Sequence, residues 1–188
     1  PHMVLEDVRK QAIERGLVVT GSEIVGLIPL EAMLMAGRFY LDKQLKSPGV
    51  PETHIIETAI QSMGLRDVSP FDPEKKIVEY RFKERGRLAN MNQQAFADEL
   101  STDSPAPGGG SVAALAGALG AALTAMVSNL TFNKKGYKDV NREMVEIGTK
   151  GQAIKDFLLQ AIDRDTEAFN QVMAAMRAPE EERDEALE

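Results

Sequence analysis

Hydrophobic positions in the first half of the chain recur mainly at helical spacing. Three segments carry this pattern and predict amphipathic helices: 4–15, 29–41 and 52–63. Gly16 and Gly64 mark the ends of the first and the last, and Pro29 suits the first position of the middle one. Residues 17–20, Leu-Val-Val-Thr, predict a short buried strand, and residues 21–28 predict a turn and a second extended piece. This order of elements is typical of α/β or α+β folds.

The second half of the chain shows helical patterns alone. Asp72 and Pro73 predict a last short helix of the first half, and the polar residues 83–92 predict a linker. Beyond the linker, helices are predicted over 93–100, 112–131 and 138–177. Short connections between helices favour an antiparallel bundle.

We expect the chain to be a piece of a longer protein with two domains. Residues 1–3 resemble a cloning remnant, 4–82 would be the first domain, 83–92 the linker and 93–188 the second domain. Pro179 and the glutamates after it predict one more helix start. The expected fold is α+β and mostly helical, with a small α/β part followed by an incomplete all-α antiparallel bundle.

A loop of small residues precedes the most apolar helix. Ser104-Pro-Ala-Pro-Gly-Gly-Gly-Ser111 has almost no side chains, and unpaired amides at a helix N-terminus attract anions. Ser111 is a suitable N-cap, because its hydroxyl can accept from an amide two or three residues on. Two stripes of small residues behind it would let other helices approach closely: Ala113, Gly117, Ala121 and Ala125, beside Ala116, Gly120, Thr124 and Ser128.

Several interpretations of this loop and helix compete. A transmembrane span is disfavoured, because the uninterrupted apolar run from Val112 to Leu123 is about half of the ~20 residues that a bilayer requires. A dinucleotide fingerprint over 108–113 lacks a preceding strand, and a P-loop lacks its Gly-Lys-Ser/Thr ending. A bundle helix without a ligand and an anion-binding helix start both remain open.

Composition and charge exclude several classes of function. The chain has no cysteine, which excludes disulfides and thiolate metal sites, and it shows no secretory leader. A formal charge of -7 argues against nucleic acid as a partner. His54 fits a satisfied or solvent-facing histidine better than a metal ligand. We expect a cytoplasmic protein with no metal and no nucleic-acid or membrane partner.

Two aspartates of the last long helix point in different directions. Asp165 falls on the apolar stripe of that helix, whereas Asp163 points roughly 200° away and is expected to be a solvated surface acid. A carboxyl on the stripe is costly unless it is paired, and it suits general acid or base chemistry. Asp165 is therefore either catalytic or part of a structural polar layer or buried ion pair.

A basic and aromatic cluster follows the small-residue helix. Lys134, Lys135 and Tyr137 lie within four positions of the chain. They either complement the dipole at the end of that helix or bind the carboxylates of an acidic ligand. The residues alone favour neither role.

Motifs in both halves resemble one known family. The bundle motifs, similar to the start of the cyclodeaminase/cyclohydrolase bundle, are Phe96-Ala-Asp-Glu-Leu100, Ser104 to Leu123, Asn129-Leu-Thr131 and Asp163-Arg-Asp-Thr-Glu-Ala-Phe169. Residues 21–30 and 70–80 are similar to the last part of a glutamate formiminotransferase domain. In this order the motifs resemble the formimidoyltransferase-cyclodeaminase family, bifunctional folate enzymes of histidine degradation.

The resemblance implies a reaction and a set of site residues. In that family the bundle closes 5-formimino-tetrahydrofolate to 5,10-methenyl-tetrahydrofolate and releases ammonia, and the other domain transfers the formimino group from formiminoglutamate to tetrahydrofolate. The family's catalytic aspartate falls on Asp165. The expected contacts to a folate polyglutamate are Gly108, Gly109, Gly110, Ser111, Asn129, Lys134, Lys135 and Tyr137. The glycine loop would hold the pterin side, and the lysines would hold the glutamate tail.

The resemblance also sets limits. The part of the family's transferase domain that bears its catalytic histidine is missing here, and His54 does not correspond to it. The bundle is cut short, so we expect this chain to lack full activity and to form a homo-oligomer through its uncovered apolar face. The alternatives are a methenyl-tetrahydrofolate cyclohydrolase on the same bundle and a non-catalytic helical assembly module.

Overall fold

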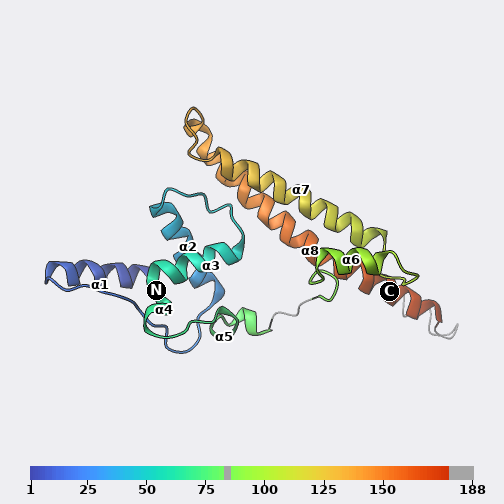
Figure 1. The fold of residues 1–188 in the computed structure, drawn as a ribbon, viewed down its shortest axis with the longest axis horizontal. Coiled ribbons are helices and arrows are strands. Elements are labelled where there is room, and N and C mark those ends of the chain that lie inside the picture. Colours follow the sequence, from blue (N-terminus) through green and yellow to red (C-terminus); the bar gives the residue numbers. More distant parts are fainter. Residues whose placement is uncertain (83–85, 178–188) are drawn as a thin grey trace. The chain divides into compact units, whose positions relative to one another are not determined.

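The computed structural model describes residues 1–82 and 86–177, and their regular structure is helical (Figure 1). The α-helices and the two 3-10 helices, labelled η, are α1 (His2–Glu14), α2 (Leu30–Lys43), α3 (Glu52–Met63), α4 (Leu65–Val68), α5 (Pro73–Lys76), η1 (Glu79–Phe82), α6 (Gln93–Leu100), α7 (Gly109–Thr131), η2 (Lys138–Val140) and α8 (Asn141–Arg177). The described residues form two compact units, the first from 1–82 and 125–150 and the second from 86–124 and 151–177. The helix expected from Pro179 lies outside the described residues.

Local sequence signals place most helix ends where they are predicted. Gly16 and Gly64 follow α1 and α3 with φ angles of 71° and 65°, the left-handed conformation that glycine adopts without a steric penalty. Pro29 directly precedes α2. Asn92 caps α6, because its side-chain oxygen accepts from Ala95 N at 2.8 Å. These ends depend on single residues and their immediate neighbours, which the sequence displays directly.

The predicted α/β part is wrong, because the described residues contain no strand. Residues 17–20 pair with no other segment as a strand, and Val18 is 86% exposed. Among residues 1–82 and 86–177 the bridge pairing is one parallel bridge, in which Ile28 N donates to Lys76 O at 2.9 Å and Val78 N donates to Ile28 O at 3.0 Å. An apolar run becomes a strand only where a neighbour completes its hydrogen bonds. The described chain is all-α rather than α+β.

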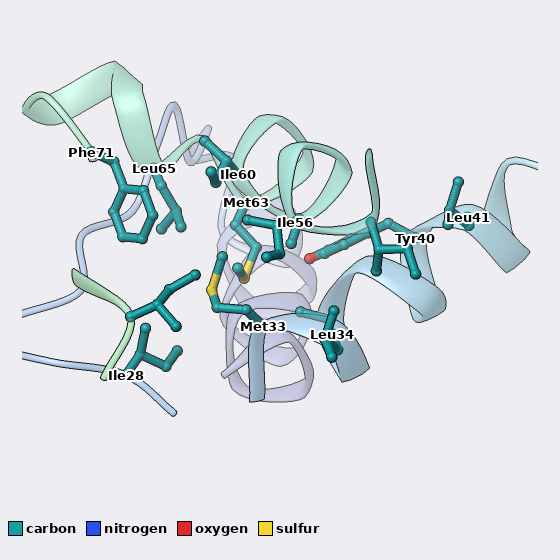
Figure 2. Close-up of a cluster of buried hydrophobic side chains, with 14 residues drawn as sticks. Ile28, Met33, Leu34, Tyr40, Leu41, Ile56, Ile60, Met63, Leu65 and Phe71 are labelled. Atoms are coloured by element: carbon teal, nitrogen blue, oxygen red, sulfur yellow. The ribbon is translucent and has the colours of Figure 1, made fainter. Parts of the chain in front are cut away.

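The first unit has a core of large apolar side chains around the contact between α2 and α3 (Figure 2). Gly37 of α2 permits this contact, because a Cβ at its position would overlap the carbonyl oxygen and side chain of Ile55 on α3. The largest fully buried side chains of the core are Met33, Leu41, Ile60, Met63 and Ile77. This part of the chain therefore closes a core of its own.

Polar contacts fasten α1 to α2. The Glu6 carboxylate accepts from Arg9 at 2.8 Å and from the Tyr40 hydroxyl at 3.1 Å, and it pairs with Lys43. The hydrogen bond from Lys43 lowers the pKa of Glu6, and burial beside this carboxylate raises the pKa of Tyr40 to about 12. The group is structural and lies within the first unit.

The helices α7 and α8 pack side by side through small residues and run antiparallel (Figure 1). Ser111 meets Ile162 near one end, and Ser128 meets Met144 near the other. The buried positions of α7 are Ser111, Ala114, Ala118, Ala125 and Ser128. They are three, four, seven and three residues apart, a spacing close to 3.5 residues per turn that follows a neighbouring helix, whereas the predicted stripes of strict fours drift around the helix. The prediction of close packing is confirmed, but Ala113, Gly117, Ala116, Gly120 and Thr124 are exposed.

Helix α7 is apolar over a longer stretch than the uninterrupted apolar run from Val112 to Leu123. The whole helix, Gly109–Thr131, is long and apolar enough to cross a membrane by length and composition. Core helices of bundles in water meet the same two criteria, so length and composition do not decide between the two settings. The absence of a membrane partner stays a prediction.

Candidate active site

The glycine loop leaves the first turn of α7 open. Ser104 folds the loop back on itself, since its hydroxyl donates to Ala106 O at 2.7 Å, and Pro107 is buried. Helix α7 begins at Gly109, and Val112 N already donates to Gly108 O at 3.1 Å. Three successive glycines therefore present backbone without side chains where the helix starts.

Asp165 of α8 lies against this turn. Its carboxylate accepts from Ser111 N at 2.9 Å, and the Ser111 hydroxyl lies 3.3 Å from the same oxygen. A Cβ at Gly110 would overlap the carboxyl group, so the position has room for glycine alone. A negative charge at the N-terminus of a helix is stabilised by the unpaired amides there. Asp165 faces α7 as its place on the stripe predicts, but it is exposed rather than buried in the bundle.

Ser111 fastens the two helices to each other. Its side chain is fully buried, and its hydroxyl donates to Ile162 O at 2.8 Å. A hydroxyl carries one proton, so this shorter contact takes it and the backbone N–H of Ser111 is the main donor to Asp165. Ser111 is thus not the N-cap that the sequence predicts, because its side chain reaches the neighbouring helix instead of its own amides.

Asp163 is not the solvated acid that the helical pattern predicts. Its two carboxylate oxygens accept from Leu88 N at 2.8 Å and from Ala89 N at 3.0 Å. A Cβ at Gly86 would overlap this carboxyl group. Asp163 therefore holds the turn that precedes α6. Helical periodicity tells which way a side chain points but not which backbone it meets, and Gly86 in a polar stretch is the signal that could have revealed the contact.

The remaining predicted site residues lie at the other end of α7. Asn129 is in its last turn, and Lys134, Lys135 and Tyr137 follow that turn and are exposed. Lys134 Nζ lies 5.7 Å from the centre of the Tyr137 ring. Asn129 and the basic cluster belong to the first unit, whereas Gly108–Ser111 and Asp165 belong to the second. The structure brings Gly108–Ser111 together with Asp165 within the second unit.

No metal centre is visible among residues 1–82 and 86–177. These residues contain no group of three or more His, Cys, Asp or Glu side chains that could hold a metal ion. His54 is exposed on α3. The chemistry that the described site can offer is that of one carboxylate beside open helix amides.

Both halves of the chain match known proteins. Residues 92–188 match the formiminotransferase-cyclodeaminase family, and residues 1–83 match the formiminotransferase domain. The chain belongs to the formiminotransferase-cyclodeaminase family. It covers the end of the transferase domain and the start of the cyclodeaminase domain, as the order of the motifs indicates.

The relatives that this chain matches are longer than the chain itself. The formimidoyltransferase-cyclodeaminase of Rattus norvegicus is 38% identical over 189 residues, which are 97% of this chain and 35% of that protein. The Dictyostelium discoideum protein of the same name is 41% identical over 182 residues, or 95% of this chain and 34% of that one. A methenyltetrahydrofolate cyclohydrolase of Methylorubrum extorquens is 41% identical over 90 residues, which are 48% of this chain and 43% of that protein. The chain spans about a third of the length of the formimidoyltransferase-cyclodeaminases.

Proposed function

We propose that the protein containing this chain is a formimidoyltetrahydrofolate cyclodeaminase that also carries glutamate formimidoyltransferase activity. Its bundle would convert 5-formimino-tetrahydrofolate to 5,10-methenyl-tetrahydrofolate and ammonia. The observation that carries this proposal is the contact of Asp165 with Ser111 N at 2.9 Å, at the open start of α7. Family membership supports the folate substrate, and this contact supports the place where the substrate reacts.

The reaction needs one proton from the enzyme. N10 of the folate attacks the formimino carbon, a carbon–nitrogen bond forms, and the former imine nitrogen becomes an amine. The bond from carbon to that amine then breaks. Ammonia leaves with three hydrogens: the original imine hydrogen, the proton released from N10 and one proton from an acid. Protonated Asp165 would supply the last of these, because it is the carboxyl beside the glycine loop.

The glycine loop would bind the pterin side of the substrate. Gly108, Gly109 and Gly110 leave their backbone groups accessible, and a flat ring can approach such a backbone without meeting a side chain. Lys134, Lys135 and Tyr137 belong to the first unit and not to the unit of the glycine loop. We keep them as proposed contacts for the far end of a polyglutamate tail, whose carboxylates suit lysine. We further propose a cytoplasmic homo-oligomer that uses a tetrahydrofolate derivative and no metal.

The central experiment replaces Asp165 by Asn in the full-length protein. An asparagine oxygen can still accept from Ser111 N, so the helix contact survives while the proton donor is lost. We expect methenyl-tetrahydrofolate formation from the formimino substrate to fall about 10²- to 10⁴-fold, the usual share of a general acid. Glu167→Gln, which removes an exposed carboxylate of the same helix, is the matched control. An unimpaired rate in Asp165→Asn would end the proposal.

A cyclohydrolase is the second candidate, favoured by the similarity to the Methylorubrum extorquens protein. Such an enzyme adds water to 5,10-methenyl-tetrahydrofolate and releases no ammonia. Measuring ammonia release from the formimino substrate beside loss of the methenyl absorbance separates the two activities. The residues that match the formiminotransferase domain favour the cyclodeaminase. Titration with a folate polyglutamate tests the assembly module, which would show no saturable binding.

A further inference from the structure

A second contact site lies in the first unit. The loop between α2 and α3, residues 44–51, meets the hairpin tip, by which we mean the last turn of α7, the first turns of α8 and the residues between them, 125–150. The loop belongs to the part that matches the formiminotransferase domain, and the tip belongs to the part that matches the formiminotransferase-cyclodeaminase family. We propose that this contact is a built junction that couples the two parts of the chain, with Asn129 and Asn133 as its fasteners.

Two asparagine side chains make the polar half of the junction. Asn129 Nδ2 donates to Gly49 O at 2.7 Å, and Asn133 Nδ2 donates to Leu45 O at 2.7 Å. Both acceptors are backbone carbonyls of the same loop, so the contact depends on the path of the loop and not on its side chains. Gly49 is buried, so its carbonyl needs a donor inside the protein, and Asn129 supplies it, whereas Leu45 is exposed.

The orientation of Asn133 is fixed by a reciprocal pair. Asn133 N donates to Asn141 Oδ1 at 2.9 Å, and Asn141 Nδ2 donates to Asn133 Oδ1 at 2.8 Å. The side-chain oxygen of Asn133 is therefore occupied, and its nitrogen is free to face Leu45 O. Asn133 also has a φ of 59°, a conformation that asparagine tolerates better than most residues.

Two glycines make the close contact of the junction. A Cβ at Gly49 would lie 2.9 Å from Gly148 Cα, and a Cβ at Gly148 would lie 3.3 Å from Gly49 Cα and 2.6 Å from Ser128 Oγ. The backbone of the loop therefore lies directly on the backbone of α8. The loop is also braced from within, because the buried Ser47 hydroxyl accepts from Gly49 N at 3.1 Å.

The two polar atoms of the Asn129 side chain differ in their hydrogen bonding. Its Oδ1 is buried and has no hydrogen-bond partner among the described residues. The hydrogen bond from Nδ2 to Gly49 O therefore sets the orientation of this side-chain amide. A side chain held in this way serves as a fastener of the loop, a role that does not depend on the proposed folate reaction.

Hydrogen exchange on the chain as it stands tests the junction. Asn129→Ala and Asn133→Ala each remove one donor to the loop. We expect the amide hydrogens of Lys46 and Gly49 to exchange about fivefold faster in each variant, because the loss of one neutral hydrogen bond shifts the opening equilibrium of the loop by about that factor. The double variant should exchange faster still. Exchange in the middle of α2 should not change.

Leu130→Ala is the matched control, because Leu130 is exposed on the same turn of α7. Gly148→Ala gives an independent variant, since its methyl group presses on Gly49 and Ser128 and leaves both asparagines intact. Circular dichroism shows whether each variant keeps its helices. Faster loop exchange in Asn129→Ala, Asn133→Ala and Gly148→Ala, with Leu130→Ala unchanged, supports the junction. Unchanged loop exchange in the three folded variants overturns it.

Discussion

The contact of α2 with α3 and the contact of α7 with α8 both depend on a glycine, but for different reasons. At Gly37 the neighbour is the backbone of Ile55, and large apolar side chains close a core around it. At Gly110 the neighbour is the carboxylate of Asp165, which is exposed. Gly37 lets the backbones of two helices approach, whereas Gly110 leaves room for the carboxylate to which we assign the proposed catalytic role. The first contact concerns stability, and the second concerns the proposed site.

The largest effect is expected at Gly37. Gly37→Ala places a methyl group against the carbonyl of Ile55, which cannot move without shifting α3. We expect the free energy of unfolding to fall by about 3 kcal/mol, measured by urea denaturation. Met35→Ala, at an exposed position of the same helix, is the control. A Gly37→Ala chain as stable as the parent would mean that the two helices are not in close contact.

The next effect is expected at Gly110, and it concerns activity. Gly110→Ala displaces the Asp165 carboxyl, and a displacement of about 1 Å can cost on the order of 10²-fold in rate. Gly120→Ala is the control, since a Cβ at that glycine of the same helix meets nothing within 4 Å and lies outside the glycine loop. Cyclodeaminase assays of the full-length variants provide the measurement. Equal rates in the two variants would show that the exact position of Asp165 does not matter.

A smaller effect is expected at Asp163. Asp163→Asn replaces one of two accepting oxygens by an amide nitrogen, so either Leu88 N or Ala89 N loses its partner. The expected loss of stability is about 1–3 kcal/mol, with faster exchange of one of these two amides. This variant contrasts with Asp165→Asn, for which we expect lost activity and little lost stability. If Asp163→Asn leaves both amides protected, the carboxylate does not hold the turn.

The smallest effect is expected at Gly120, on the open side of α7. A Cβ at this position meets nothing within 4 Å, so Gly120→Ala adds no clash and removes the flexibility of glycine from a helix. We expect the thermal midpoint to rise, with a gain of about 0.5–1 kcal/mol. A loss of stability would instead indicate that this side of α7 is covered by another segment or another copy.

Features that depend on neighbouring residues could be predicted from the sequence, and features that depend on distant ones could not. The ends of α1 and α3 follow from Gly16 and Gly64, whose effect is local. The strand expected over 17–20 fails, because a strand exists only through its partners, and its apolar residues resemble a buried strand whether or not partners are present.

The candidate site shows the same division. Periodicity correctly directs Asp165 toward α7, because the direction of a side chain is a property of one helix. It cannot tell that Asp165 stays exposed, that Ser111 donates across to Ile162, or that Asp163 meets Leu88 and Ala89. Those contacts depend on how segments more than fifty residues apart in the chain are placed.

The division into two units gives this chain an unusual optical property. It has no tryptophan, and its three tyrosines, Tyr40, Tyr80 and Tyr137, all belong to the first unit. Tyrosine fluorescence therefore reports the unfolding of the first unit, while the far-ultraviolet signal of the helices reports both. Two melting curves recorded on one sample, without any label, distinguish units that unfold together from units that unfold in turn.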